Sequence, residues 1–360
     1  MAGRTAHRNL HVAPHHFLLL VAPLAVLFGL DLLLDLFGDS TLAPAAIIPD
    51  AEARIVELTG RYRYLAAFAL FGAVSLAVLA IFGVDLAANY TRASVLYALM
   101  ALVGMLIAGA LLAGVESQLP WQSPTHRMLG DNFLETALGR GRVNVCGACL
   151  QMCGEAAPAG FCTVCGTIEC RAGGFAVFRA LAEPINALTS ASASAGFAGL
   201  ILSLGRSDPG GSTYERLAAE AADLRAGERI ARRYLFCLGG LLTAGMTFLL
   251  AWMYWPAALI ADPGERAAYL DLVGALSLYI GVGYSVLIAA GYVPVTLLHV
   301  LRMESFEQRY EQLTLEGHGA FERPSVPELG YAEGLRRILA VLSPILASAI
   351  GSFGQDVLFG

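Results

Sequence analysis

Long apolar blocks alternate along the chain with stretches that hold most of its charged residues. A segment of about 20 apolar residues is long enough to cross the hydrocarbon core of a bilayer, and it must be helical there because its backbone groups can bond only to one another. Five segments meet this length: residues 17–37, 64–84, 95–115, 234–260 and 272–300. The pattern predicts an all-α integral membrane protein with about five transmembrane helices.

Two weaker apolar stretches are interpreted differently. Residues 175–204 have apolar positions at helical spacing that are interrupted by Arg179, Glu183 and Pro184, and the stretch then becomes rich in Ser, Ala and Gly. This composition favours an amphipathic segment at the membrane surface or a re-entrant segment, with a sixth span as the alternative. Residues 335–350 form a shorter apolar stretch, for which we predict an amphipathic interfacial helix in the C-terminal tail.

Charged stretches with helical character adjoin three of the spans, at residues 50–63, 212–233 and 302–315. Ser212 and Glu215 have the spacing of a capping box at a helix start. We expect these stretches to continue from the membrane as helical stalks on one side of it. The chain is then divided into regions 1–115, 116–211, 212–315 and 316–360.

The second and third spans resemble the fourth and fifth. The sequence RYRYL precedes one pair and RRYLF the other, and Leu96-Tyr97 corresponds to Leu278-Tyr279. These similarities indicate a possible repeat of two helical hairpins, both of which would start from the same side of the membrane.

Composition agrees with a membrane protein, because 57% of the residues are hydrophobic and only 14% are charged. All 23 basic residues are arginine. With five spans, 19 of these arginines can lie on one side of the membrane, whereas with a sixth span near residues 187–204 only 14 can. The positive-inside rule therefore favours five spans, with the long 116–233 loop in the cytoplasm. We therefore expect a multi-pass protein of a bacterial inner membrane. The first apolar block could also be a signal peptide behind Arg4 and Arg8.

Six of the seven cysteines fall within residues 146–170. Two C-x2-C pairs separated by twelve residues have the spacing of a tetrahedral zinc site, since each short turn directs two thiolates toward one ion. The run from Cys162 to Gly166 resembles a zinc knuckle. The sequence thus predicts a structural zinc module whose ligands are Cys146, Cys149, Cys162 and Cys165, with Cys153 and Cys170 as possible further ligands.

Other chemistry remains open for these cysteines. Four of them would suffice for an iron–sulfur cluster, and three disulfides would form if the segment faces an oxidising compartment. The seventh cysteine, Cys237, lies inside the fourth span and is expected to be a core residue.

Asp31 and Asp35 lie one helical turn apart in the first apolar block and are candidates for an ion or proton path. No nucleophile elbow, P-loop, dinucleotide fingerprint or HExxH motif is present, and the net charge of −6 gives no support for nucleic-acid binding. We expect a non-enzymatic channel-like, transporter-like or sensor component, as an oligomer or a subunit of a membrane complex. The alternative is an electron-transfer subunit with an iron–sulfur cluster.

Overall fold

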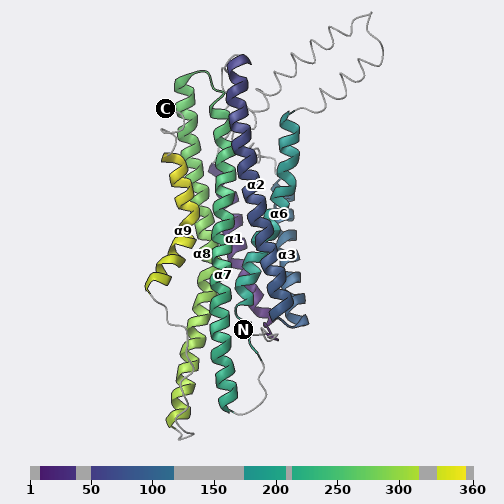
Figure 1. Cartoon of the computed structure of the whole chain (residues 1–360), viewed down its shortest axis with the longest axis vertical. Coiled ribbons are helices and arrows are strands. Elements are labelled where there is room, and N and C mark those ends of the chain that lie inside the picture. Colours follow the sequence, from purple (N-terminus) through teal and green to yellow (C-terminus); the bar gives the residue numbers. More distant parts are fainter. Residues whose placement is uncertain (1–8, 38–49, 117–173, 208–212, 316–330, 354–360) are drawn as a thin grey trace, which may run out of the picture.

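The computed structural model describes residues 9–37, 50–116, 174–207, 213–315 and 331–353, which form an elongated bundle of helices (Figure 1). In chain order these are the 3-10 helix η1 (Pro14–Leu20) and the α-helices α1 (Val21–Phe37), α2 (Asp50–Asn89), α3 (Arg92–Glu116), α6 (Gly174–Leu202), α7 (Thr213–Ala257), α8 (Pro263–Leu315) and α9 (Tyr331–Phe353). Among the described residues, six helices are long and apolar enough to cross a membrane, namely α2, α3, α6, α7, α8 and α9. The predicted all-α membrane architecture is confirmed.

The longest helices join a predicted span to its charged neighbour without a break. Helices α2, α7 and α8 have 40, 45 and 53 residues. At 1.5 Å per residue, α8 is about 80 Å long, more than twice the thickness of the hydrocarbon core. The prediction that the charged stretches continue from the spans as helices is therefore confirmed. Figure 1 shows α7 and α8 extending beyond the other helices at the bottom, which we call the stalk end, and we call the opposite end the far end.

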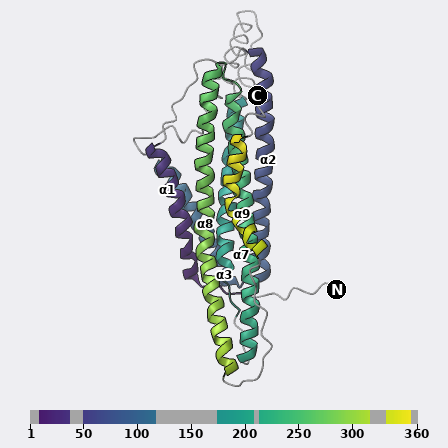
Figure 2. The same cartoon turned by 90° about the vertical axis from the view of Figure 1, so that its left-hand side faces the viewer.

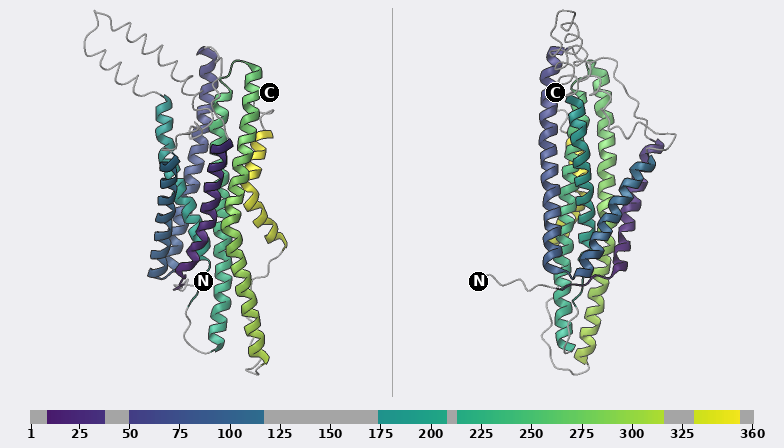
Figure 3. Two further views of the ribbon diagram at one scale, coloured as in Figure 1. Left: turned by 180° about the vertical axis from the view of Figure 1, so that it is seen from behind. Right: turned by 90° about the vertical axis from the view of Figure 1, so that its right-hand side faces the viewer.

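Helix α6 runs through the bundle, where we had predicted a surface or re-entrant segment. It begins at the far end and finishes at the stalk end, and 61% of its most apolar window is buried inside the bundle. Helix α3 ends at the far end, so both helices that flank residues 117–173 meet that segment there (Figures 1 and 3). This differs from the predicted arrangement, in which the cysteine segment and the stalk 212–233 share one side.

The two predicted hairpins also run in opposite directions. Helix α2 begins at the far end, whereas α7 begins at the stalk end (Figure 1). The charged stretch at the start of α2 consequently lies at the far end, away from the two stalks. A parallel duplication, in which both hairpins start from the same side, is therefore wrong.

Small residues on α6 allow its neighbours to approach closely. A Cβ atom at Gly199 would lie 2.3 Å from the Tyr234 ring of α7, and one at Gly196 would lie 2.6 Å from Leu238. Small residues are the usual means of close helix packing in membranes, because an apolar bilayer offers little hydrophobic drive for helices to associate. Tyr234 and Leu238 are fully buried as a result, and α6 and α7 form the centre of the bundle.

Helix α9 packs against α7 and α8 along its length, where we had predicted an interfacial helix. Ser348 donates to the Ser277 hydroxyl of α8 at 3.3 Å, and Ser343 donates to the Gly239 carbonyl of α7, also at 3.3 Å. In contrast, α1 leans away from the bundle at its C-terminal end (Figure 2). Its described contacts are mainly with α8, where Tyr279 donates to the Leu30 carbonyl at 2.8 Å.

Candidate functional site: a polar junction at the base of the stalks

The two stalks are a pair of helices that pack together beyond the rest of the bundle. A small core cluster joins them, made of Leu217, Ala221, Leu224 and Phe306. Arg309 of α8 also forms an ion pair with Glu220 of α7, with a distance of 2.5 Å between the guanidinium nitrogen and the carboxylate oxygen. The two stalks are therefore held together as one unit.

Helix α6 ends against the base of this unit. The Ser203 hydroxyl, one residue beyond the end of α6, lies 3.0 Å from Nε2 of His299 on α8. Arg302, three residues further along α8, donates to the Leu204 carbonyl at 3.1 Å. Carbonyls that follow a helix end have no partner within the helix, and a cation beside them also complements the helix dipole. The stalk helix α8 thus binds the C-terminal end of α6.

Gly227 brings the third helix into the same contact. A Cβ atom at this position of α7 would lie 2.4 Å from the Ser203 carbonyl oxygen and 2.7 Å from Cε1 of His299. Only glycine allows α7 to approach the other two helices this closely. We use the name stalk junction for this meeting point of Ser203, Gly227 and His299, together with the ion pairs described next.

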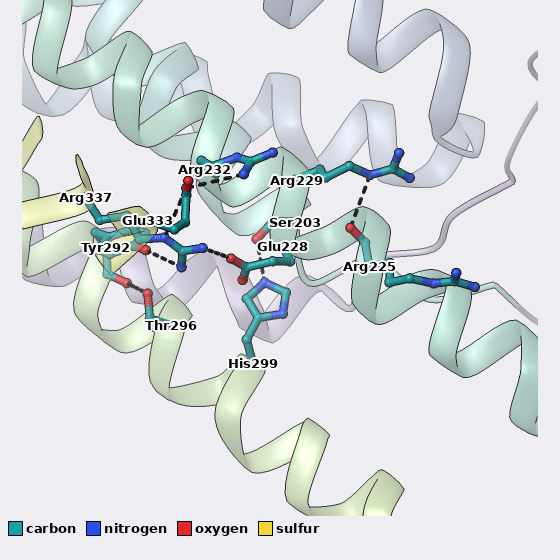
Figure 4. A network of polar contacts seen from close by, with 10 residues as sticks. All are labelled: Ser203, Arg225, Glu228, Arg229, Arg232, Tyr292, Thr296, His299, Glu333 and Arg337. Atoms are coloured by element: carbon teal, nitrogen blue, oxygen red, sulfur yellow. Dashed lines mark hydrogen bonds and ion pairs between the residues drawn. The ribbon is translucent and has the colours of Figure 1, made fainter. Parts of the chain in front are cut away.

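Helix α9 joins the stalk junction through charged side chains (Figure 4). Arg337 is buried, forms an ion pair with Glu228 of α7 and donates to the Tyr292 hydroxyl of α8 at 3.2 Å. Glu333 lies 3.3 Å from a guanidinium nitrogen of Arg232 and 3.6 Å from Nε of Arg337. A buried charge is tolerated only with a well-placed partner, so these contacts restrict how α9 can sit on α7 and α8.

Helix α2 is connected at the same level. Both carboxylate oxygens of Asp85 accept from Arg233, at 2.6 and 2.9 Å. Just beyond α2, Tyr90 donates to the Leu202 carbonyl at 2.9 Å, near the end of α6. Burial raises the pKa of Tyr90, and the negative charge of Asp85 raises it further, so this phenol remains a hydrogen-bond donor at physiological pH.

The N-terminal segment completes this arrangement. The backbone of Leu10 bonds to Asn89 and Thr91 in the α2–α3 turn, while the backbone of His11 bonds in both directions to Arg206, which follows α6. The segment therefore joins the α2–α3 turn to the chain that leads from α6 into the stalk.

The contacts of the stalk junction join helices to one another. The polar side chains of the stalk junction are occupied with one another or with helix ends. Within the described part of the chain, no group of three His, Cys, Asp or Glu residues is placed to hold a metal ion.

The predicted site residues fall largely beyond what the structure describes. Cys146, Cys149, Cys153, Cys162, Cys165 and Cys170 all lie outside the described residues. Asp31 and Asp35 belong to α1, but their side chains are also outside the described part. Cys237 is half-buried and packs against a core cluster of α2 and α7, as expected for a core residue.

The stalk junction was not predicted from the sequence, although signals for it exist. Gly227 is a glycine within a charged helical stretch, where glycine costs up to about 1 kcal/mol relative to alanine. Such a residue usually has a packing reason. His299 lies at the end of the predicted span 272–300, and its partner just beyond α6 could not be predicted because α6 was not expected to reach this level.

Comparisons with protein-family models, with curated proteins and with solved structures find no match to this chain.

Proposed function

We propose that this protein is a non-enzymatic sensor-type membrane component that couples a cysteine-rich segment on one side of the bilayer to the helical stalk on the other. One observation carries the proposal: the end of α6 is bound by the stalk helix α8 through Ser203–His299 and Leu204–Arg302. The start of α6, Gly174, follows the cysteine segment directly in the chain. A single helix thus links the two regions.

Helix α6 is suited to transmit a displacement because it is closely packed. Its glycines contact Tyr234 and Leu238 of α7, and Phe197 of α6 lies against Gly291 of α8, where a Cβ atom would be 2.6 Å from the ring. Closely packed interfaces shift between discrete arrangements more readily than they deform gradually. A shift of α6 would therefore move the base of the stalk.

A sensor-type role is favoured over a transport path by what the described intramembrane polar groups do. Ser192 donates to the backbone carbonyls of Ser75 and Leu188, and Ser277 donates to that of Gly274. These hydroxyls are therefore used in helix packing, and no role in lining a transport path is needed to explain them. The exposed apolar faces suit a bacterial inner membrane, with assembly into an oligomer or a larger complex as part of the proposal.

The proposal requires the six cysteines to staple the segment that contains them, and two chemistries can do this. The paired C-x2-C spacing supports zinc, which can contribute on the order of 10 kcal/mol to the folding of a small module. If α6 is counted as a span and the N-terminus is assigned to the side of the stalk, however, 14 of the 23 arginines fall on that side. This count supports a cytoplasmic stalk and a cysteine segment outside, where disulfides form. Elemental analysis together with a count of free thiols separates zinc from disulfides, and bound iron would instead support the electron-transfer alternative.

The coupling is tested by hydrogen–deuterium exchange in reconstituted protein. Replacing Cys162 and Cys165 with serine should increase amide exchange in the stalk stretches 213–233 and 302–315, because loss of the staple frees the start of α6. In a protein that also carries Gly227→Ala, which separates the helices at the stalk junction, the cysteine replacements should add little further change. Exchange that changes only near the cysteines in both backgrounds would contradict the proposed coupling.

A further inference from the structure

A groove between α2, α7 and α9 near the far end carries a separate inference, which does not depend on the proposed coupling. Its volume is about 880 Å³, within the usual range for ligand sites. The groove exists because two rows of small residues face each other across it. Thr243, Thr247 and Ala251 follow one another at intervals of four on α7, and Ser343, Ala347 and Gly351 do so on α9.

On the stalk side of the groove, α7 and α9 approach each other closely at Gly239. At Gly239 a Cβ atom would lie 2.6 Å from the Ala340 carbonyl, so the two helices touch there. One wall at the far end is formed by Trp255, whose ring packs so closely on α2 that a Cβ atom at Gly60 would lie 2.2 Å from it.

The lining changes in character along the groove. Its apolar lining includes Leu250, Leu346 and Ile350, all of which belong to helices with membrane-spanning character. Its far end is lined by Arg63 of α2 and Arg266 of α8, beside Tyr254 and Trp255. Tyr and Trp gather at the membrane interface, so the two arginines lie at the level of lipid headgroups.

The polar groups at this site can accept an anionic ligand. Arg266 is fixed in place, since its Nε and Nη2 atoms donate to the Ile260 carbonyl at 3.2 and 2.7 Å. The described part of the chain offers no carboxylate as an ion-pair partner to Arg266, so its positive charge is not neutralised there. Deeper in the groove, the buried Thr243 hydroxyl has no hydrogen-bond partner among the described residues.

We propose that this groove is a binding site for an anionic phospholipid of the bilayer. Arg63 and Arg266 bind the phosphate headgroup, and an acyl chain lies between α7 and α9 along Thr247, Ala251 and Ala347. A lipid is the occupant because an apolar groove that opens at membrane depth is continuous with the acyl chains around it, and the charge at its mouth selects an anionic headgroup.

The test is a titration of the detergent-purified full chain with phosphatidylglycerol and with phosphatidylcholine, with bound lipid measured by native mass spectrometry. Arg63→Gln and Arg266→Gln should each weaken phosphatidylglycerol binding by about fivefold and leave phosphatidylcholine binding unchanged. Arg61→Gln is the matched control, because it removes a charge from the same turn of α2 without changing the groove lining, and it should have no effect. Ala347→Phe, which narrows the groove, should weaken binding of both lipids.

Three results would overturn the proposal. Equal loss in Arg61→Gln would mean that general charge at the far end attracts the lipid. If both arginine variants kept the preference for phosphatidylglycerol over phosphatidylcholine, the arginines would not select the headgroup, and the groove would only bind acyl chains. Competition by inorganic phosphate as strong as that by phosphatidylglycerol would identify a free anion, and not a lipid, as the ligand.

Discussion

Glycines determine which residues can meet at the stalk junction. Gly227 permits contact among α6, α7 and α8, and Gly239 permits contact between α7 and α9. Neither contact could be predicted from the sequence, because the partner of each glycine is a backbone carbonyl that is distant in the chain. The arginines near helix starts were visible in the sequence, but their pairing was not, since Arg337 meets Glu228 across 109 positions of the chain.

Gly227→Ala tests this close contact. The added methyl group must push apart Ser203 and His299, and overpacking of this kind typically costs about 1–3 kcal/mol of unfolding free energy. The unfolding midpoint of the protein in detergent should therefore fall. Gly240→Ala is the matched control on the same helix, because a Cβ atom there has nothing within 4 Å. Its better helix propensity should leave the midpoint unchanged or raise it, and equal effects of the two substitutions would contradict the packing account.

At the scale of elements, hydropathy identified the most apolar helices and misjudged the less apolar α6 and α9. The most apolar window of α2 has a mean hydropathy of 2.6 and is 28% buried, whereas that of α6 has a mean hydropathy of 1.4 and is 61% buried. A helix surrounded by other helices does not need an apolar outer face, and its Ser, Ala and Gly residues serve packing. For this reason α6 appeared too polar to be a span. Helix α9 was underestimated because its apolar stretch is short and has Arg336 and Arg337 at its start, although Arg337 is paired in the structure.

The docking of α9 should depend on Arg337. Arg337→Gln leaves Glu228 without its partner, at a cost below the 3–5 kcal/mol typical of a fully buried pair. Docking can be followed by replacing Ser277 and Ser348 with cysteine, because their hydroxyl oxygens are 3.3 Å apart and the new thiols can form a disulfide. We expect Arg337→Gln to lower the yield of this crosslink. Arg336→Gln, at the exposed neighbouring position, should leave it unchanged, and equal yields in all variants would show that the ion pair does not hold α9.

At the scale of the whole molecule, the direction of one helix decides the arrangement of the rest. The sequence predicted an all-α membrane protein with continuous helical stalks, and both features agree with the structure. It also predicted that all three charged stretches share one side, because α6 was not expected to run through the bundle. Once α6 passes through the bundle, α2 and α7 begin at opposite ends, and the cysteine segment and the stalk are attached to different ends (Figure 1).

The central claim is that α6 carries the chain from the side of the cysteine segment to the side of the stalk. It is tested most directly by labelling intact cells with a membrane-impermeant thiol reagent, using single cysteines at two exposed positions, Ser305 in the stalk of α8 and Asp262 in the α7–α8 turn at the far end. We predict that Asp262→Cys is labelled from outside and that Ser305→Cys is labelled only after the membrane is opened. The native cysteines of the 146–170 segment, after reduction, should be labelled from outside, as Asp262→Cys is. Labelling of the native cysteines together with Ser305→Cys, from the same side, would contradict this claim.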